Sequence, residues 1–196
     1  MKYKILLASN SPRRREILEM LRIPFTVVTM EGIDESYPAD MEPTKVSEYI
    51  SGKKADAFLK RIGEKELIIT ADTVVICDGK ILGKPKDSGE AERMLEFLSG
   101  KTHTVTTGVT IATKTKRISF SVESHVTFAD LTRDEIRYYV DTFHPLDKAG
   151  AYGIQEWIGG VAVARIEGSF YNVMGLPVHR LYQELKEFSP QSLPWH

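Results

Sequence analysis

Cysteine is almost absent from this chain of 196 residues, which contains only Cys77. A single cysteine can form neither an intrachain disulfide nor a cysteine metal cluster, and it fits a reducing compartment such as the cytoplasm. Long hydrophobic runs are also missing. The apolar stretch at residues 5–8 is too short for the hydrophobic region of a signal peptide, and no run approaches the roughly 20 residues that span a bilayer. We therefore expect neither a membrane-spanning helix nor a membrane partner.

The chain also has little excess charge of either sign. Its 26 Lys and Arg residues nearly balance its 27 Asp and Glu residues, which leaves a net charge of −1. Proteins that coat nucleic acids are usually basic overall, so we do not expect a nucleic-acid partner, although a local basic site remains compatible with this balance. The hydrophobic fraction of 42% and the length suit a globular protein with one domain, or with two small lobes that share a core.

Several motifs of known chemistry are missing. The five histidines show no short spacing of the kind that metal ligands have, and the GxxxxGK[ST] phosphate-binding loop does not occur. The GxSxG elbow of serine hydrolases is absent as well. These absences exclude the common sequence signatures of P-loop enzymes and of many serine hydrolases.

Strand and helix patterns alternate in the first part of the chain, and two longer alternating strands follow. The patterns predict strands at residues 3–8, 25–28, 67–70 and 161–166, a hairpin at 74–82, paired strands within 105–128, and helices that start at Ser11 and Thr132 or end near Gly63, Gly100 and Phe188. A glycine-rich stretch covers residues 150–160. The predicted class is α/β, with a mixed twisted sheet, flanking helices and a cleft where the early strands end. A single domain would cover residues 1–188, followed by a loose tail at 189–196.

The segment from Ser9 to Arg15 is the first candidate binding site. It follows a predicted strand and opens a helix, where free backbone N–H groups and the helix dipole favour an anion. Arg13 and Arg14 can hold phosphate oxygens with their forked donors. The alternative is a capped helix whose first turn is basic and solvated, although cations there oppose the dipole.

Two further candidates follow predicted strands. Asp72 lies where a strand is expected to leave the sheet, and it could hold a divalent cation or accept a proton from an attacking water. Alternatively, Asp72 caps a turn. Lys84 follows the hairpin and offers a mobile positive charge for a phosphate, or is an ordinary surface lysine.

The last two candidates combine polar side chains with flexible backbone. Asp34 and Glu35 lie in an acidic loop, with Lys54 on the next helix, and carboxylates of this kind suit Mg²⁺; the alternative is a solvated loop and helix face. Residues 147–155 contain two glycines and two alanines, which allow close approach to a planar ligand. Gln155 carries a donor and an acceptor for a base edge, unless the segment is simply a tight loop.

Taken together, these segments resemble the Maf family of nucleotide pyrophosphatases. The similarity runs from about residue 4 to residue 188 and preserves the order and spacing of six stretches. These stretches are LASNSPRRREIL at 7–18, ITADTVV at 69–75, GKILGKP at 79–85, LSGKTHTVTTGV at 98–109, PLDKAGAYGIQ at 145–155 and GLPVHRLY at 175–182. The resemblance implies an inosine-triphosphatase-like fold with two lobes around a nucleotide-binding cleft.

The resemblance also implies an activity and a set of site residues. Family members hydrolyse nucleoside triphosphates between the α- and β-phosphates and need a divalent cation, here Mg²⁺ or Mn²⁺ with Co²⁺ as a further candidate. Asp72 matches the proton acceptor and, with Glu35, a metal-binding position. Arg13, Thr73 and Gln155 match the subgroup that acts on dTTP and UTP. The remaining matches to substrate-binding positions are Ser9, Arg14, Lys54 and Lys84.

Two departures from the family pattern are present. Gly52-Lys53 stands where relatives usually have larger helix formers, and Glu156-Trp157-Ile158 stands where the link is often shorter and glycine-rich. The second departure bears on the rim of the base pocket. The resemblance further implies a nucleotide as substrate, modified pyrimidine nucleotides included, and a possible homodimer. The alternative function is a nucleotide-responsive regulator of cell division or septum formation without turnover.

Overall fold

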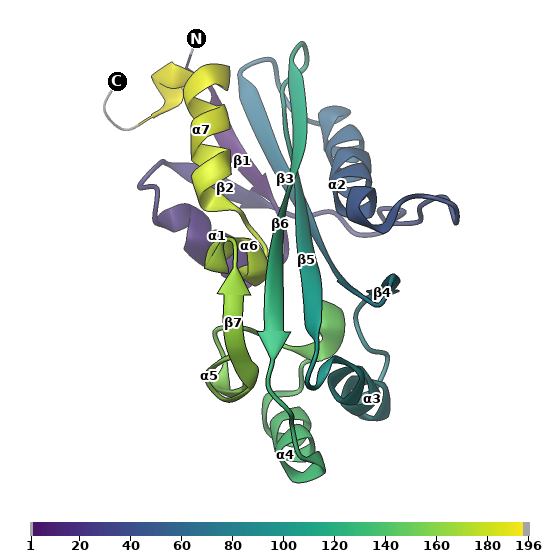
Figure 1. The fold of residues 1–196 in the computed structure, drawn as a ribbon. Coiled ribbons are helices and arrows are strands. Elements are labelled where there is room, and N and C mark those ends of the chain that lie inside the picture. The colour runs from purple at the N-terminus through teal and green to yellow at the C-terminus, as the bar shows by residue number, and fades with distance from the viewer. Residues whose placement is uncertain (1, 194–196) are drawn as a thin grey trace. The chain divides into compact units, whose positions relative to one another are not determined.

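The computed structural model describes residues 2–193, and its helices and strands can be followed in Figure 1. The strands are β1 (Lys4–Ala8), β2 (Phe25–Val28), β3 (Glu66–Cys77), β4 (Lys80–Leu82), β5 (Thr102–Ala112), β6 (Arg117–Phe128) and β7 (Val163–Glu167). The α-helices are α1 (Pro12–Glu19), α2 (Pro43–Leu59), α3 (Ser88–Leu98), α4 (Arg133–Phe143), α5 (Trp157–Ala162), α6 (Phe170–Met174) and α7 (Val178–Phe188). Short 3₁₀ turns occupy η1 (Ala149–Ala151) and η2 (Pro190–Ser192).

Within the described residues, the strands form one mixed sheet. Its order is β2-β1-β3-β5-β6-β7, and β4 pairs with β3. β1 runs parallel to β2 and β3, whereas the β3–β4 and β6–β7 pairs are antiparallel. The predicted α/β class with a mixed sheet and flanking helices is therefore confirmed. None of the helices within residues 2–193 has the length and apolar character needed to cross a membrane.

The described residues divide into two compact units. The first unit contains the chain up to Asp72, the segment Thr107–Val122, and the chain from Gly175 onward. The second unit contains Thr73–Thr106 and Glu123–Met174. Because β3, β5 and β6 each contribute residues to both units, neither unit corresponds to one continuous stretch of the sequence.

The core of the first unit depends on buried parallel strands. Leu7 on β1 and Leu67–Ile69 on β3 are completely buried, as expected for strands covered on both faces. α2 lies very close to β5, because a Cβ at Gly108 would overlap the backbone of α2 at Glu48. The Ser51 hydroxyl on α2 lies 2.9 Å from that of Thr110, and Thr70 donates to the Ser51 carbonyl at 2.7 Å. These contacts fix α2 against the strands.

The second unit has its own core, built from α3, α4, α5 and the strand segments beside them. The predicted hairpin is confirmed, with positive φ at both Asp78 (49°) and Gly79 (73°), as a type I′ turn requires. The helix predicted to start at Thr132 is also present, and Thr132 and Glu135 bond reciprocally there in a capping box at the start of α4.

Two local predictions are wrong. The strands predicted at 67–70 and 74–77 are parts of the single strand β3, because the strand continues where the sequence showed a polar interruption. The strand predicted to start at 161 begins only at Val163, as β7, because the glycine-rich stretch before it contains the start of α5, whose buried Ile158 packs into the core of the second unit. The helix α6 was not predicted.

The C-terminal segment is more ordered than predicted as far as Leu193. The Ser192 hydroxyl accepts a hydrogen bond from the Tyr3 amide at 3.1 Å, and Leu193 is buried. The prediction of a loose tail is therefore wrong for residues 189–193, since Tyr3, just before β1, supplies a partner that the local sequence does not reveal. Residues 194–196 lie outside the described residues. The proposed domain limits stay a prediction.

A buried histidine lies in the second unit. His103 on β5 is 2% exposed, and its Nε2 atom lies 2.8 Å from the Tyr152 hydroxyl. The rings of Phe128 and Tyr152 contact it edge to face, at centroid distances of 4.9 and 5.4 Å. Because burial penalises the charged imidazolium, the pKa of His103 falls to about 4.

We predict that His103 makes the protein less stable in acid. In the unfolded chain a histidine titrates near pKa ~6.5, so between pH 6.5 and 4 the unfolded state binds a proton that the folded state refuses, and stability falls as the pH falls. Between pH 6.5 and 5, the free energy of unfolding of the wild-type protein should fall by about 1.5 kcal/mol more than that of His103→Gln. Urea denaturation at each pH measures this, with the exposed His125→Gln as control. Equal pH dependence in wild type and His103→Gln would contradict the prediction.

Candidate functional site

One lysine joins two predicted acidic site residues in the first unit. The Lys54 ammonium lies 2.8 Å from Asp72 Oδ1 and 3.1 Å from Glu35 Oε1. The Lys54 and Asp72 side chains are only 14% and 13% exposed, whereas Glu35 is 50% exposed. The Lys54–Asp72 pair is thus shielded from water, which strengthens its attraction relative to a surface ion pair, while Glu35 remains open to solvent.

The strands place Asp72 beside a strand end. We expected Asp72 where a strand leaves the sheet, and this detail is wrong, because Asp72 lies within the continuous strand β3. The neighbouring strand β1 ends at Ala8, which pairs with Thr70. Asp72 therefore lies two residues beyond the last β1 contact of β3, where a polar side chain no longer has β1 beside it.

The acidic loop that carries Glu35 is held by Lys53. The Lys53 ammonium donates to Asp34 Oδ2 at 2.7 Å and to the Ser36 carbonyl at 2.8 Å. Asp34 Oδ1 in turn accepts the Ser36 amide at 2.9 Å, which closes a tight turn. The hydrogen bond from Lys53 lowers the pKa of Asp34 well below its usual range. Successive lysines of α2 thus hold the loop and contact its glutamate.

The basic segment after β1 lies in the same unit. Arg14 Nε donates to the Gly175 carbonyl at 2.8 Å, which anchors this half-buried side chain. Burial lowers the pKa of Arg14, while the charges of Asp72 and Glu35 oppose that change and Arg13 adds to it. These four charged groups therefore lie within electrostatic range of one another.

The start of α1 partly matches the prediction. Pro12 is the first helical residue and Ser11 the N-cap, but the Ser11 side chain makes no capping hydrogen bond. Ser9 instead accepts the Ser11 amide at 3.1 Å, so it shapes the turn between β1 and α1. The third arginine of the run, Arg15, points elsewhere and pairs with Glu19.

The second unit holds the other predicted site residues. Thr73 follows Asp72 directly in β3, while Lys84 and Gln155 are exposed in separate loops. The Gly150 amide donates to the Gly83 carbonyl at 3.0 Å, and a Cβ at Gly150 would lie 3.1 Å from Val75. The segments that carry Thr73, Lys84 and Gln155 are therefore in mutual contact. That the residues of both units surround one triphosphate stays a prediction.

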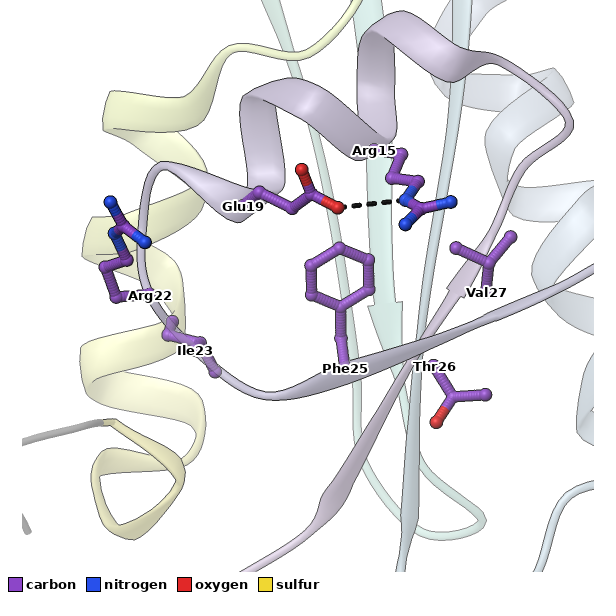
Figure 2. Close-up of a pocket in the computed structure, with 7 residues that line it drawn as sticks. All are labelled: Arg15, Glu19, Arg22, Ile23, Phe25, Thr26 and Val27. Carbon is purple, nitrogen blue, oxygen red and sulfur yellow. Dashed lines mark hydrogen bonds and ion pairs between the residues drawn. The ribbon is translucent and has the colours of Figure 1, made fainter.

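A surface pocket of about 550 Å³ in the first unit lies apart from these residues. Figure 2 shows the paired Arg15 and Glu19 side chains of α1 above Phe25 of β2. The pocket is lined by Arg15, Glu19, Arg22, Ile23, Phe25, Thr26 and Val27. Only Arg15, at the end of the candidate segment Ser9–Arg15, is among them, and its side chain pairs with Glu19, so this pocket adds no support to the predicted site.

A metal ion would need ligands beyond the protein. Within residues 2–193, no three or more His, Cys, Asp or Glu side chains are grouped as a metal site. Glu35 and Asp72 nevertheless gather carboxylate oxygens around one positive charge. Two carboxylates completed by phosphate oxygens and water are the donor set that Mg²⁺ commonly uses, so the residues fit a cation that arrives with a phosphorylated substrate.

Sequence patterns alone missed several residues that support the site. Lys53 and Glu156 are visible in the sequence only as departures from the family pattern, and neither suggests its contacts. Lys148 was noted only as part of a loop, and Tyr139 only as an apolar helix position. Departure from the family pattern was the only available signal, and it covered Lys53 and Glu156 but neither Lys148 nor Tyr139.

We predict that Lys53 controls the order of the acidic loop. Replacing Lys53 with Met removes the donor shared by Asp34 and Ser36, so the Ser36 amide should exchange with solvent about tenfold faster. Hydrogen exchange measured by NMR tests this, and Lys60→Met, an exposed lysine at the end of α2, is the matched control. Unchanged exchange at Ser36 in the Lys53 variant would show that the loop is held by other contacts.

Comparison with known proteins identifies the family. The chain matches the family described as Maf-like protein over residues 4–188. It is 56% identical over 189 residues to the dTTP/UTP pyrophosphatase of Porphyromonas gingivalis, covering 95% of each chain, and 54% identical over 186 residues to that of Bacteroides thetaiotaomicron, covering 95% and 96%. The solved structure of the Staphylococcus aureus Ham1 protein has the same fold, with a TM-score of 0.54 at 16% identity over 94% of this chain and 98% of that one. The protein described here thus belongs to the Maf family.

Proposed function

We propose that the protein is a nucleoside triphosphate pyrophosphatase that hydrolyses dTTP and UTP, modified pyrimidine nucleotides included, to the monophosphate and pyrophosphate. The observation that carries the proposal is the Lys54 ammonium held between Asp72 and Glu35, with Arg14 nearby. Relatives that share more than half of their residues with this chain carry the name dTTP/UTP pyrophosphatase. In the reaction, water oxygen bonds to the α-phosphorus and the bond to the α–β bridging oxygen breaks.

The first task of such an enzyme is to neutralise its substrate. A triphosphate repels the attacking oxygen, so cations must offset its charge and hold it in line. We assign this role to Arg13, Arg14, Lys54 and Lys84, with Ser9 shaping the turn beside them. An ion pair at 4 Å contributes about 1 kcal/mol in water but about 4 kcal/mol at an effective dielectric near 20. The shielded Lys54 should therefore contribute more than the exposed Lys84.

The second task is to activate water. Asp72 is a carboxylate that can take the proton as the water oxygen bonds to phosphorus. Glu35 and Asp72 are also the residues that would hold a divalent cation, Mg²⁺, Mn²⁺ or Co²⁺. When bound, such a cation would stabilise negative charge on the leaving pyrophosphate. Asp72 is a candidate for both roles, base and metal ligand, and both use its carboxylate oxygens.

The third task is to choose the base. Gln155 and Thr73 together offer donors and acceptors that can pair with the carbonyl and N–H edge shared by thymine and uracil. Arg13 is the third residue of this subgroup pattern. Cytosine presents an amino group where thymine and uracil present a carbonyl, so it would leave a donor facing a donor. A homodimer and a cytoplasmic location remain predictions, the latter resting on the single cysteine.

We predict that Asp72→Asn abolishes turnover and preserves nucleotide binding. The amide keeps the size of the side chain but can neither accept the proton nor offer a charged metal ligand. Pyrophosphate release from dTTP with Mg²⁺ or Mn²⁺ should fall by at least about a thousandfold, while dTTP affinity measured by calorimetry stays within about threefold. The exposed Asp141→Asn is the control.

Two outcomes of that experiment would contradict the proposal. Turnover by Asp72→Asn within about tenfold of wild type would refute both roles of Asp72. Absence of pyrophosphate release from every nucleoside triphosphate by the wild-type protein, with dTTP still bound, would favour the regulatory alternative over an enzyme.

We also predict discrimination among bases. The wild-type protein should hydrolyse dTTP and UTP with kcat/KM values at least about a hundredfold above that for CTP, because the cytosine amino group would face a donor where thymine and uracil present a carbonyl. A panel of canonical and modified nucleoside triphosphates, with pyrophosphate release as the readout, measures this. Hydrolysis of CTP or purine triphosphates as fast as that of dTTP would contradict the assignment of Gln155 and Thr73.

A further inference from the structure

The backbone that leads to Gln155 follows an unfavourable path. Gly150 and Ala151 both have positive φ, at 69° and 60°. Glycine adopts this conformation freely, but alanine does so at a cost of about 1 kcal/mol. Ala151 is completely buried, while Gln155 four residues later is exposed. A segment that is locally unfavourable and ends in an exposed side chain needs tertiary contacts to keep that side chain in one place.

A buried ionic cluster provides such contacts. The Lys148 side chain is only 8% exposed, and its ammonium lies 2.7 Å from Asp147 Oδ1 and 3.1 Å from Glu156 Oε1. Glu156 uses its other oxygen to accept a short hydrogen bond from the hydroxyl of Tyr139, which is fully buried in α4. The Tyr139 hydroxyl in turn accepts the Gly153 amide at 3.0 Å. The chain of contacts therefore runs from Lys148 through Glu156 and Tyr139 to the backbone.

The protonation, charge and packing of the cluster all favour the observed contacts. Burial, assisted by the hydrogen bond to Glu156, raises the pKa of Tyr139, so its hydroxyl stays protonated and can donate. Removing one partner of a buried ion pair leaves an uncompensated charge, which makes the arrangement resistant to change. Packing is equally close, because a Cβ at Gly153 would lie 2.8 Å from Glu156 Cδ and 2.9 Å from Lys148 Cε.

Residues that the cluster holds lie on both sides of Gln155 in the sequence. Gly153 precedes Gln155 by two residues and Glu156 follows it directly, and the Glu156 amide donates to the Gly153 carbonyl at 2.9 Å. Both flanking residues are thus anchored to Tyr139, although Gln155 has an exposed side chain. We propose that Lys148, Glu156 and Tyr139 form a positioning cluster that holds Gln155 for base recognition and so sets the discrimination between uracil or thymine and cytosine. This inference rests on the proposed function.

Substitutions of Glu156 and Tyr139 test the positioning role. In Glu156→Gln the shape is kept but the charge facing Lys148 is lost, and Tyr139→Phe removes the shared hydroxyl. In both variants, kcat for dTTP should stay within about threefold of wild type, KM for dTTP should rise, and the dTTP-to-CTP ratio of kcat/KM should fall about tenfold. The Gly153 amide should also exchange faster with solvent. The double variant should lose no more discrimination than either single variant, because both break one chain of contacts.

Matched controls separate the failures of the two proposals. Glu167→Gln, an exposed glutamate paired with Arg165 on β7, should change none of these quantities. Gln155→Ala should lower the dTTP-to-CTP ratio at least as much as Glu156→Gln. If Gln155→Ala lowers the ratio while Glu156→Gln and Tyr139→Phe leave it and the Gly153 exchange unchanged, the positioning role is wrong and the proposed function stands.

Other outcomes are equally decisive. An equal fall of kcat for dTTP, UTP and CTP in Glu156→Gln, with an unchanged ratio, would show a general structural role and overturn the inference. If Gln155→Ala itself leaves the ratio unchanged, Gln155 does not read the base, and the base assignment falls together with its positioning cluster. Loss of dTTP hydrolysis is not expected in Glu156→Gln or Tyr139→Phe, because the phosphate-binding cations and Asp72 are unaltered.

Discussion

The Lys54 ammonium is the interaction on which the candidate site depends. Two carboxylates close to one another repel, and the Lys54 ammonium between Asp72 and Glu35 offsets that repulsion. Because Asp72 and Lys54 are largely shielded from water, their distance must be set by rigid elements and not by chance approach of surface groups. The charged side chains of the site are already arranged before a ligand binds. Binding therefore has to order fewer side chains than it would in a flexible site.

The rigid elements are supplied by small residues. Gly108 lets α2 approach β5 at a distance that a Cβ would prevent, and Ser51 then bonds to both neighbouring strands. β1 is shorter than β3, so Asp72 lies on β3 beyond the last residue of the neighbouring strand β1. Lys53 and Lys54 are neighbours on α2. Lys53 holds the acidic loop through Asp34, and Lys54 contacts Glu35 of that loop.

The second unit uses a different arrangement for its candidate base reader. Gln155 is exposed, whereas its flanking backbone is held by the buried Tyr139 and by the largely buried pair of Lys148 and Glu156. Buried ions that are fully paired are costly to rearrange, so they suit a residue that must stay in one position. A side chain that recognises a base must be accessible to the ligand and must also be held in one position. An exposed Gln155 whose neighbours are held by largely buried side chains fits both needs.

Local sequence determined the elements whose signals lie within a few residues: the Asp78-Gly79 hairpin, the Thr132 capping box, and the mixed α/β alternation. The order and spacing of the motifs also determined which residues were candidates for the site, because both can be read from the sequence alone. Tertiary structure alone decided that 67–70 and 74–77 form one strand, that Trp157 opens a helix, and that residues 189–193 pack onto the start of the chain. It also decided that Lys53 and Glu156 act as supports. These outcomes depend on partners distant in sequence, because hydrogen bonds and burial are set by what lies nearby in space, and a local pattern carries no record of that.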